Sequence, residues 1–204
     1  MQYAGGSYKW MKETLCHEEI RMAQEKGCSP YEIMNERIAS CEPGAGGVVF
    51  LPYLLGERAP RWNPDAKGVF YGITATTTRE QILRSVMEGI IMNLGICFDI
   101  LGRDEKIEEI LLIGGAARSS QWRRGIADIF GCNVLVPKYL EEAGSMGAAV
   151  IAGVGSGIYK DFSAIDKFIE VQSKVEPDLK SKEIYTPLRE TFEEVYQALK
   201  PVMR

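Results

Sequence analysis

The hydrophobic and polar residues of this chain follow two spacings, one typical of helices and one typical of buried strands. The longest helical pattern begins with a capping box formed by Thr78 and Gln81 and continues to about Leu101, before Gly102. Its apolar residues fall on one stripe, at Ile82, Val86, Gly89, Ile90, Leu94 and Phe98. The pattern therefore predicts a long helix with one face against a core.

Two further helices are predicted before this one. The first covers about residues 7–25 and ends at Gly27, with apolar positions spaced among charged ones. The second begins at Ser29, where the hydroxyl is followed by a proline at the first helical position and a glutamate three residues after the cap. His17 lies on the charged first helix, so we expect it to be solvated and not catalytic.

Two short strands and one loop are expected next. Residues 48–51 form an apolar run typical of a buried strand, and residues 68–73 form a second strand. The intervening segment 52–65 is rich in proline, glycine and arginine, which predicts a loop. We expect this loop to be ordered because three of its large side chains need burial: Tyr53, Leu54 and Trp62.

The second half of the chain alternates strands with helices. Strands are expected at residues 109–113 and 133–136, and helices at residues 120–130 and 144–152. Alternation of this kind implies crossover connections onto a mainly parallel portion of sheet. The fold class is therefore α/β.

The last segment, residues 161–203, is more polar and is expected to be largely helical. Thr186-Pro187 is interpreted there as a second helix start, with a cap followed by a proline. No linker or internal repeat is evident, so the 204 residues are interpreted as one domain.

Composition excludes several classes of function. A formal net charge of -4 gives no basic surface for nucleic acid. Five scattered cysteines without a C-x-x-C pair predict reduced thiols, mostly in the core, and no zinc site. The N-terminal residues lack a signal-peptide pattern, and no stretch approaches the ~20 apolar residues that span a bilayer. We therefore expect a cytoplasmic protein that binds neither nucleic acid nor membrane.

Candidate chemistry centres on a glycine turn at residues 110–120. A buried apolar strand leads into Gly114 and Gly115, and a helix starts at Ser119 or Ser120. Adjacent glycines allow a ligand to approach the backbone, and the following helix presents free amides to that point. This arrangement is either a nucleotide shelf or an ordinary tight connection, and the segment alone favours the ordinary connection. It is neither a G-x-G-x-x-G fingerprint nor a G-x-x-x-x-G-K phosphate loop.

A second glycine corner, Gly5-Gly6, is expected to precede the first helix, with Lys9 within reach of its first turn. Anion binding is physically reasonable at such a helix start. The alternative is a mobile terminus with a solvated lysine, which is the usual state of terminal residues. Taken alone, this corner favours the alternative.

Together these segments resemble the C-terminal domain of the FGGY carbohydrate kinases, from Ala4 to about Phe162. The most specific resemblance, over residues 68–88, is to the second signature pattern of the family. The other matching segments are the loop F-L-P-Y-L with G-E-R-A-P at residues 50–60, the motif G-G-A-A-R-S at residues 114–119, and Glu142 with G-A-A at residues 147–149. Within the loop, Glu57 and Arg58 are interpreted as pairing with each other to fix its shape.

The resemblance implies an actin-like ATPase (ribonuclease H-like) domain, a mixed sheet flanked by helices, over residues 1–204. It implies ATP or ADP as ligand with Mg²⁺ as cofactor, Gly114, Gly115 and Ser119 beside the adenine and ribose, and Gly5 and Lys9 beside the phosphates. Arg118 either stacks on the base or reaches solvent. At Ser119 the related glycerol kinases have an asparagine, so a side-chain contact there could differ.

In the family the catalytic base, an aspartate, and most sugar contacts come from an N-terminal half. No aspartate here lies in a matching context, so no catalytic residue and no metal ligand are assigned. We expect the sequence to lack that half, to bind adenine nucleotide weakly and not to phosphorylate sugar alone. The uncovered face would expose apolar area, which makes a homodimer a candidate assembly.

The reaction implied for the complete enzyme is transfer of the ATP γ-phosphoryl group to a sugar hydroxyl. D-Xylulose is the first candidate substrate, and gluconate or another sugar or polyol follows. A different class of function, a non-catalytic actin-like nucleotide-binding module, stays open. The loop around Glu57 favours the kinase because it is a feature of the sugar-kinase branch.

Overall fold

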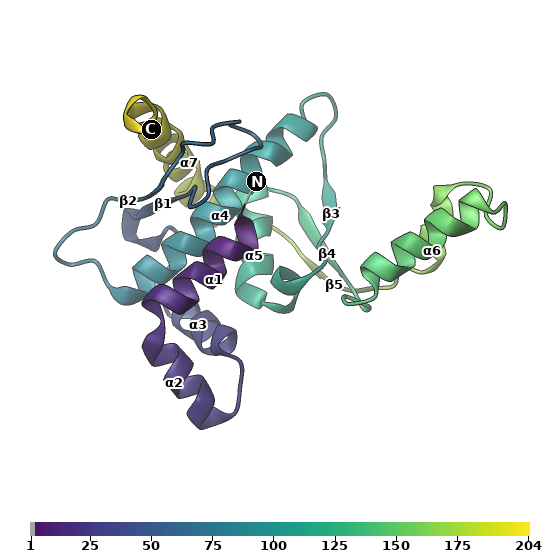
Figure 1. The fold of residues 1–204 in the computed structure, drawn as a ribbon, viewed down its shortest axis with the longest axis horizontal. Helices are drawn as coiled ribbons and strands as arrows, with labels where there is room; N and C mark the ends of the chain where they lie inside the picture. The colour runs from purple at the N-terminus through teal and green to yellow at the C-terminus, as the bar shows by residue number, and fades with distance from the viewer. Residues whose placement is uncertain (1–2) are drawn as a thin grey trace. The chain divides into compact units, whose positions relative to one another are not determined.

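A computed structural model describes residues 3–204, which pack as two compact units (Figure 1). Unit 1 takes in the chain through Lys106 together with Asp128–Phe130 and Asp178–Arg204. Unit 2 takes in Ile107–Ala127 and Gly131–Pro177. Each unit has its own packing. The assignment of residues 1–204 to one domain stays a prediction.

The core of unit 1 forms around helix α4 (Arg79–Leu101) and a two-stranded antiparallel sheet. Strand β1 (Val49–Pro52) pairs with β2 (Gly68–Tyr71), and all four residues of β1 are buried. Both strands and the capping box at the start of α4 were predicted correctly. Gly89 lets the helix lie on the strand, because a Cβ there would come within 2.1 Å of the Phe50 carbonyl oxygen.

Helix α4 is long and apolar enough to cross a membrane by length and composition, contrary to the expectation from sequence. In its most apolar window 67% of the residues are buried inside the fold. Core helices of this kind satisfy the same criterion, and here the apolar residues form the packing surface of unit 1.

The N-terminal segment of unit 1 folds as three helices. The prediction of one helix over residues 7–25 is wrong: α1 (Ala4–Leu15) and α2 (His17–Lys26) are separated at Cys16, whose φ of -108° and ψ of 42° are not helical. The fully buried Cys16 side chain fixes this break in the core. Helix α3 (Pro30–Ala39) begins at the predicted capping box, and His17 is exposed as expected.

The loop between β1 and β2 is ordered, but not through all the side chains that were predicted to anchor it. Tyr53 is fully buried, whereas Trp62 is 79% exposed, so its predicted burial is wrong. Arg61 anchors the loop in its place. Its guanidinium donates to the Tyr53 hydroxyl (3.0 Å), pairs with Glu193 (2.7 Å) and lies over the Tyr196 ring.

The last helix of unit 1, α7 (Leu179–Leu199), is continuous and leads into the short 3-10 turn η4 (Lys200–Val202). The predicted start at Thr186-Pro187 is wrong, because Pro187 lies inside the helix. The cap is Asp178, whose carboxylate accepts from the Lys180 N–H at 3.0 Å. Thr186 instead donates its hydroxyl to the Lys182 carbonyl (2.8 Å), a helix-interior interaction.

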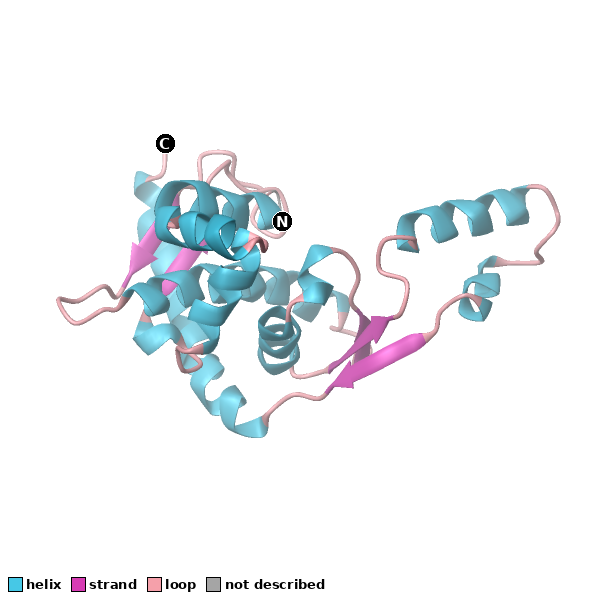
Figure 2. Cartoon of the chain, turned by 90° about the horizontal axis from the view of Figure 1, so that it is seen from below, coloured by secondary structure: helices cyan, strands magenta, loops and turns pink. Residues whose placement is uncertain are grey.

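Unit 2 is built on a three-stranded mixed sheet, drawn in magenta in Figure 2. Strands β3 (Glu109–Leu111) and β4 (Asn133–Pro137) are parallel and are connected through α5 (Ser120–Phe130), as predicted. Strand β5 (Val171–Val175) pairs antiparallel with β4 and was not predicted. Its sequence is polar and largely exposed, so it lacks the apolar run that revealed the other strands.

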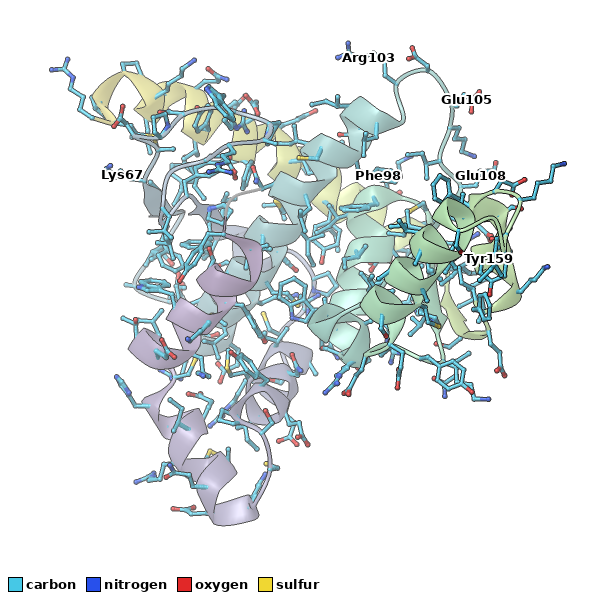
Figure 3. All side chains as sticks on the ribbon, turned by 45° about the vertical axis from the view of Figure 1, so that its right-hand side comes forward. Lys67, Phe98, Arg103, Glu105, Glu108 and Tyr159 are labelled. Atoms are coloured by element: carbon cyan, nitrogen blue, oxygen red, sulfur yellow. The ribbon has the colours of Figure 1, made fainter. Side chains whose placement is uncertain are left out.

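The connection from β4 to β5 contains helix α6 (Ala143–Gly155) and the 3-10 segment η3 (Phe162–Lys167). Tyr159, labelled in Figure 3, contacts the ring of Phe168 edge-on, with 6.3 Å between centroids. A Cβ at Gly153 would come within 2.4 Å of the Tyr159 ring. The glycine therefore lets the chain fold back onto α6.

Candidate functional site

The glycine turn of unit 2 joins the end of β3 to α5 and is open to solvent. Gly114 has φ 79° and ψ -164°, in the region that glycine alone enters readily. The 3-10 turn η2 (Gly115–Arg118) follows, and its first hydrogen bond runs from the Ala117 N–H to the Gly114 carbonyl at 3.1 Å. The N–H groups of Gly115 and Ala116 come before the Ala117 N–H in the chain, at the start of this turn. A Cβ added at Gly114 or Gly115 would meet nothing within 4 Å, so no packed side chain blocks this corner.

Ser119 is the N-cap of α5. Its side chain is buried, with 9% of the residue exposed, and its hydroxyl accepts from the Trp122 N–H at 3.4 Å. Its carbonyl accepts from the Arg123 N–H at 3.0 Å. These contacts fix the direction in which α5 leaves the glycine turn. A capping serine at this place is what the local sequence predicts.

Arg118 is bound at the surface to a residue of the β4–α6 connection. Its guanidinium donates to the carboxylate of Glu141, and 61% of the Arg118 side chain is exposed. From the sequence, Arg118 was expected either to stack on the base or to reach solvent. The ion pair with Glu141 could not be predicted, because the two residues lie 23 positions apart. An exposed pair of this kind stabilises by ~1 kcal/mol at most, so the arginine is free to exchange partners.

Gly5 and Lys9 lie in unit 1, on helix α1. The prediction that the glycines precede the helix is wrong, because Gly5 and Gly6 belong to its first turn after the N-cap Tyr3. Gly5 is exposed with nothing within 4 Å of an added Cβ, and the Lys9 ammonium lies 3.8 Å from the Glu13 carboxylate. The structure thus brings Gly114, Gly115, Arg118 and Ser119 together in unit 2 and places the other two predicted residues in unit 1.

A cavity of unit 2 lies beside the glycine turn. It has a volume of about 170 Å³ and is mostly apolar. Leu111 and Ile113, which lead into Gly114, line one part of it, and Tyr139, Met146 and Phe168 line others. The cavity therefore continues the open corner toward α6.

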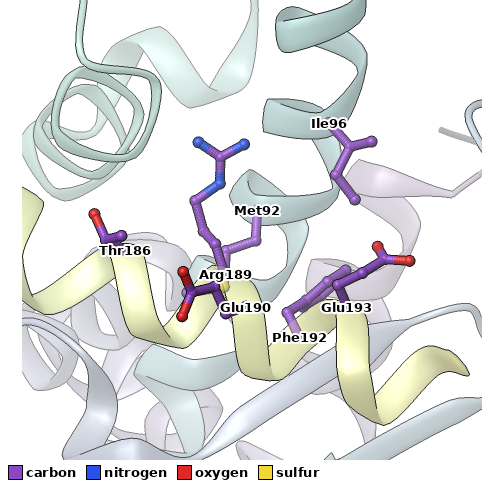
Figure 4. A pocket seen from close by; sticks show the side chains of 7 residues that line it. All are labelled: Met92, Ile96, Thr186, Arg189, Glu190, Phe192 and Glu193. Atoms are coloured by element: carbon purple, nitrogen blue, oxygen red, sulfur yellow. The ribbon is translucent and has the colours of Figure 1, made fainter. Parts of the chain in front are cut away.

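A larger cavity, of about 390 Å³, lies in unit 1 between α4 and α7 (Figure 4). Met92 and Phe192 are buried side chains of its wall, and Arg189 crosses it to contact Asp99 and the Ile129 carbonyl. Gly95 lies beside this arginine, and an added Cβ there would make only an ordinary van der Waals contact with its guanidinium, at 3.5 Å. Three polar side chains of this cavity, Thr186, Arg189 and Glu193, are engaged with the protein itself.

A buried polar network in unit 1 gave no recognisable signal in the sequence. The Glu88 carboxylate accepts from the Arg84 guanidinium (2.6 Å), the Tyr185 hydroxyl (2.7 Å) and the Gly44 N–H (3.0 Å). Arg84 also donates to the Cys41 carbonyl at 2.6 Å. Burial raises the pKa of Glu88, and the positive charge of Arg84 offsets part of that increase. These contacts join α4, α7 and the turn before β1, which indicates a structural role.

The loop residues Glu57 and Arg58 also have a structural arrangement. Glu57 is buried, and its carboxylate accepts from the Arg58 backbone N–H (2.8 Å) and from the Asn93 amide (2.7 Å). The predicted pairing of these two neighbours therefore involves the backbone of Arg58. The loop is thereby fixed to α4.

Among residues 3–204 no group of three or more His, Cys, Asp or Glu side chains is arranged to hold a metal ion. The five cysteines are free thiols, as predicted. The expectation that most of them lie in the core is wrong, because only Cys16 and Cys132 are buried, whereas Cys28, Cys41 and Cys97 are partly exposed. Burial raises the pKa of each of the two buried thiols to about 11, so they are neutral at physiological pH.

Residues 1–156 match the C-terminal domain of the FGGY family of carbohydrate kinases, and the chain belongs to this family. The gluconokinase of Bacillus licheniformis is 34% identical over 193 residues, which are 94% of this chain and 37% of that protein. The chain thus spans little more than a third of the length of this relative.

Two solved structures bear on the fold. The xylulose kinase of Lactobacillus acidophilus matches with a TM-score of 0.84 and 28% identity, over 98% of this chain and 39% of that one. The glycerol kinase of Plasmodium falciparum, solved with ADP, matches with a TM-score of 0.74 and 27% identity, over 94% of this chain and 37% of that one. The mixed α/β fold is therefore that of the FGGY kinase C-terminal, actin-like ATPase domain, as predicted.

Proposed function

We propose that this chain is the ATP-binding part of a carbohydrate kinase, and that Gly114 and Gly115 form the shelf for adenosine. The single observation that carries the proposal is the open corner at these glycines, directly before a capped helix. A planar base can lie against the backbone there, and the amides of the helix start favour a nearby negative charge. The apolar cavity beside Ile113 offers a surface for the base.

In this proposal the remaining predicted residues have distinct roles. Ser119 holds the start of α5 and flanks the ribose, and Arg118 exchanges Glu141 for the nucleotide. Gly5 and Lys9 are proposed phosphate contacts; both are exposed. Mg²⁺ would come with the nucleotide, where it spreads charge over the phosphates.

The complete reaction would transfer the γ-phosphoryl group of ATP to a sugar hydroxyl in the cytoplasm. The base that takes the hydroxyl proton is proposed to come from an N-terminal half, with residues 1–204 acting as the C-terminal domain. D-Xylulose is the first candidate substrate and gluconate the second, because relatives of both kinds match at similar identity. By itself the present sequence would bind nucleotide and leave sugar unphosphorylated.

Thermal unfolding with and without nucleotide tests the proposal. A ligand that binds the folded state raises the melting temperature, by an amount that grows with the ratio of its concentration to its Kd. We expect millimolar ATP or ADP to raise it, and expect Gly115→Leu to abolish that rise. The leucine side chain would enter open space, so the fold should be retained.

Gly155→Leu is the matched control, because Gly155 lies in the same unit and also has open space around it. This variant should keep the nucleotide-dependent rise. An unchanged response in Gly115→Leu would place the nucleotide elsewhere. The absence of any response in the unsubstituted protein would overturn the proposal.

A further inference from the structure

The ion pair between Arg118 and Glu141 joins two segments that border the same cavity of unit 2. Arg118 is the last residue of the turn η2, which begins at Gly115. Glu141 lies in the connection from β4 to α6, between Tyr139 and Ala143. Both of these neighbours line the apolar cavity, and so do the residues of the strand that leads into the glycine turn. The pair therefore links the glycine turn to the other segment beside the cavity.

The pair also neutralises a positive charge beside the proposed adenosine shelf. The Arg118 guanidinium donates to the Glu141 carboxylate. Lys138, a cation of the same connection, is likewise bound, with its ammonium 3.0 Å from the Glu170 carboxylate. A nucleotide is a polyanion, and at this corner it meets cations whose charges are already matched by carboxylates of the protein.

We infer that Glu141 competes with the nucleotide for Arg118 and thereby limits the affinity of the site. This inference rests on the proposed function, because it takes the nucleotide to lie at Gly114 and Gly115. When the nucleotide binds, the guanidinium leaves the carboxylate and donates to phosphate oxygens, which suit its planar fork. Only molecules in which Arg118 is free bind in this way, so the apparent affinity falls by the fraction of molecules in which it is paired.

The exposure of the pair sets the size of the effect. The side chains of Arg118 and Glu141 are 61% and 71% exposed, and exposed pairs are weak. Glu141→Gln should therefore tighten ATP binding by about two- to fivefold, because it removes the competing charge and keeps the size of the side chain. Arg118→Gln should weaken ATP binding by about twofold or more, because it removes the group for which both partners compete.

A double-mutant cycle separates competition for Arg118 from simple repulsion between Glu141 and the phosphates. If Glu141 acts through Arg118, then Glu141→Gln has no effect on ATP affinity in a protein that already carries Arg118→Gln. Repulsion would act in both backgrounds. An equal gain in affinity with and without Arg118 would therefore overturn the inference.

Ionic strength gives a second readout. Salt screens exposed charges, so it weakens the Arg118–Glu141 pair in the unsubstituted protein. The advantage of Glu141→Gln in ATP affinity should therefore shrink between about 0.05 and 0.5 M salt. An advantage that grows with salt would contradict competition between charges.

Glu109→Gln is the matched control. It removes the same charge from unit 2 and breaks another exposed pair, with Lys174 at 3.0 Å, at the start of β3. This variant should leave ATP affinity unchanged. Equal tightening in Glu109→Gln and Glu141→Gln would overturn the inference, because net charge alone would then explain the gain.

Calorimetric titration of ATP into each protein decides between the outcomes. Tighter binding in Glu141→Gln that disappears in the double variant is the expected result. Unchanged affinity in Glu141→Gln, alongside the loss expected in Gly115→Leu, would overturn this inference and leave the proposed function standing. The absence of ATP binding in every protein would overturn both.

Discussion

The guanidinium of Arg79 holds both carboxylate oxygens of Glu19, with Nε–Oε1 at 3.0 Å and Nη2–Oε2 at 2.6 Å. Glu19 is fully buried on α2, and Arg79 is the first residue of α4, so the pair ties the N-terminal helices to the core helix. The same arginine donates to the Leu15 carbonyl at 2.6 Å.

We expect Glu19→Gln to lower the free energy of unfolding by about 2 kcal/mol. This loss is smaller than the loss on breaking a fully buried pair, because Arg79 is partly exposed. Urea unfolding measures this loss, and a change below about 0.5 kcal/mol would show that the pair is dispensable.

The same pair predicts how stability responds to acid. Burial alone would raise the pKa of Glu19, but the hydrogen bond from Arg79, a backbone hydrogen bond and the positive charges of Arg79 and Arg37 together outweigh it and hold the pKa below its ordinary 4.5. The unfolded chain therefore binds the proton more readily than the folded one. The contribution of this carboxylate to stability is complete above about pH 5 and is lost as the pH falls through the lowered pKa.

Urea unfolding of the unsubstituted protein and Glu19→Gln between about pH 7 and pH 3 tests this response. The difference in unfolding free energy between the two should shrink as the pH falls. A difference that stays constant across this range would contradict the assigned pKa direction.

Gly89 is expected to be irreplaceable for steric reasons. A Cβ at this position would lie 2.1 Å from the carbonyl oxygen of Phe50, and backbone cannot move aside as a flexible side chain does. Gly89→Ala should therefore destabilise the protein by about 2–3 kcal/mol, although alanine favours helices. Gly144→Ala on α6, where the added Cβ meets nothing, should be neutral or slightly stabilising. Equal melting temperatures for the two variants would refute the close contact.

The loop between β1 and β2 offers a contrast between adjacent residues. Arg61 binds Tyr53 and Glu193, whereas the neighbouring Trp62 is 79% exposed. Arg61→Ala should cost about 2 kcal/mol of unfolding free energy because it removes a largely buried side chain together with its hydrogen bonds to Tyr53 and Glu193 and its contact with the Tyr196 ring. Trp62→Ala should change it by less than about 0.5 kcal/mol. Chemical denaturation compares the two, and a larger loss in Trp62→Ala would reverse our account of the loop.

Local signals along the chain predicted most elements correctly where the physical cause was itself local. The capping boxes at Ser29 and Thr78 and the apolar runs of β1, β3 and β4 depend on residues within a few positions. The missed features depend on distant partners. The break at Cys16 follows from core burial, and β5 is polar and forms only because β4 lies beside it.

The candidate site shows the same difference between features with a local cause and features that depend on distant partners. The open glycine turn and the cap at Ser119 follow from the local sequence, and the structure has both. The pairing of Arg118 with Glu141 and the network around Glu88 could not be predicted, because their partners come from separate segments. The start predicted at Thr186-Pro187 was wrong for a related reason: the local signal was overridden by a helix that begins at Leu179, after the cap Asp178.

Calorimetric titration of ATP into the unsubstituted protein and into Gly115→Leu tests the central claim most directly. We expect measurable one-site binding to the unsubstituted protein and at least a tenfold loss of affinity in the variant, with its melting temperature retained. Equal affinity in both proteins would show that adenosine does not lie against Gly115, and would contradict the account of this turn as the nucleotide shelf.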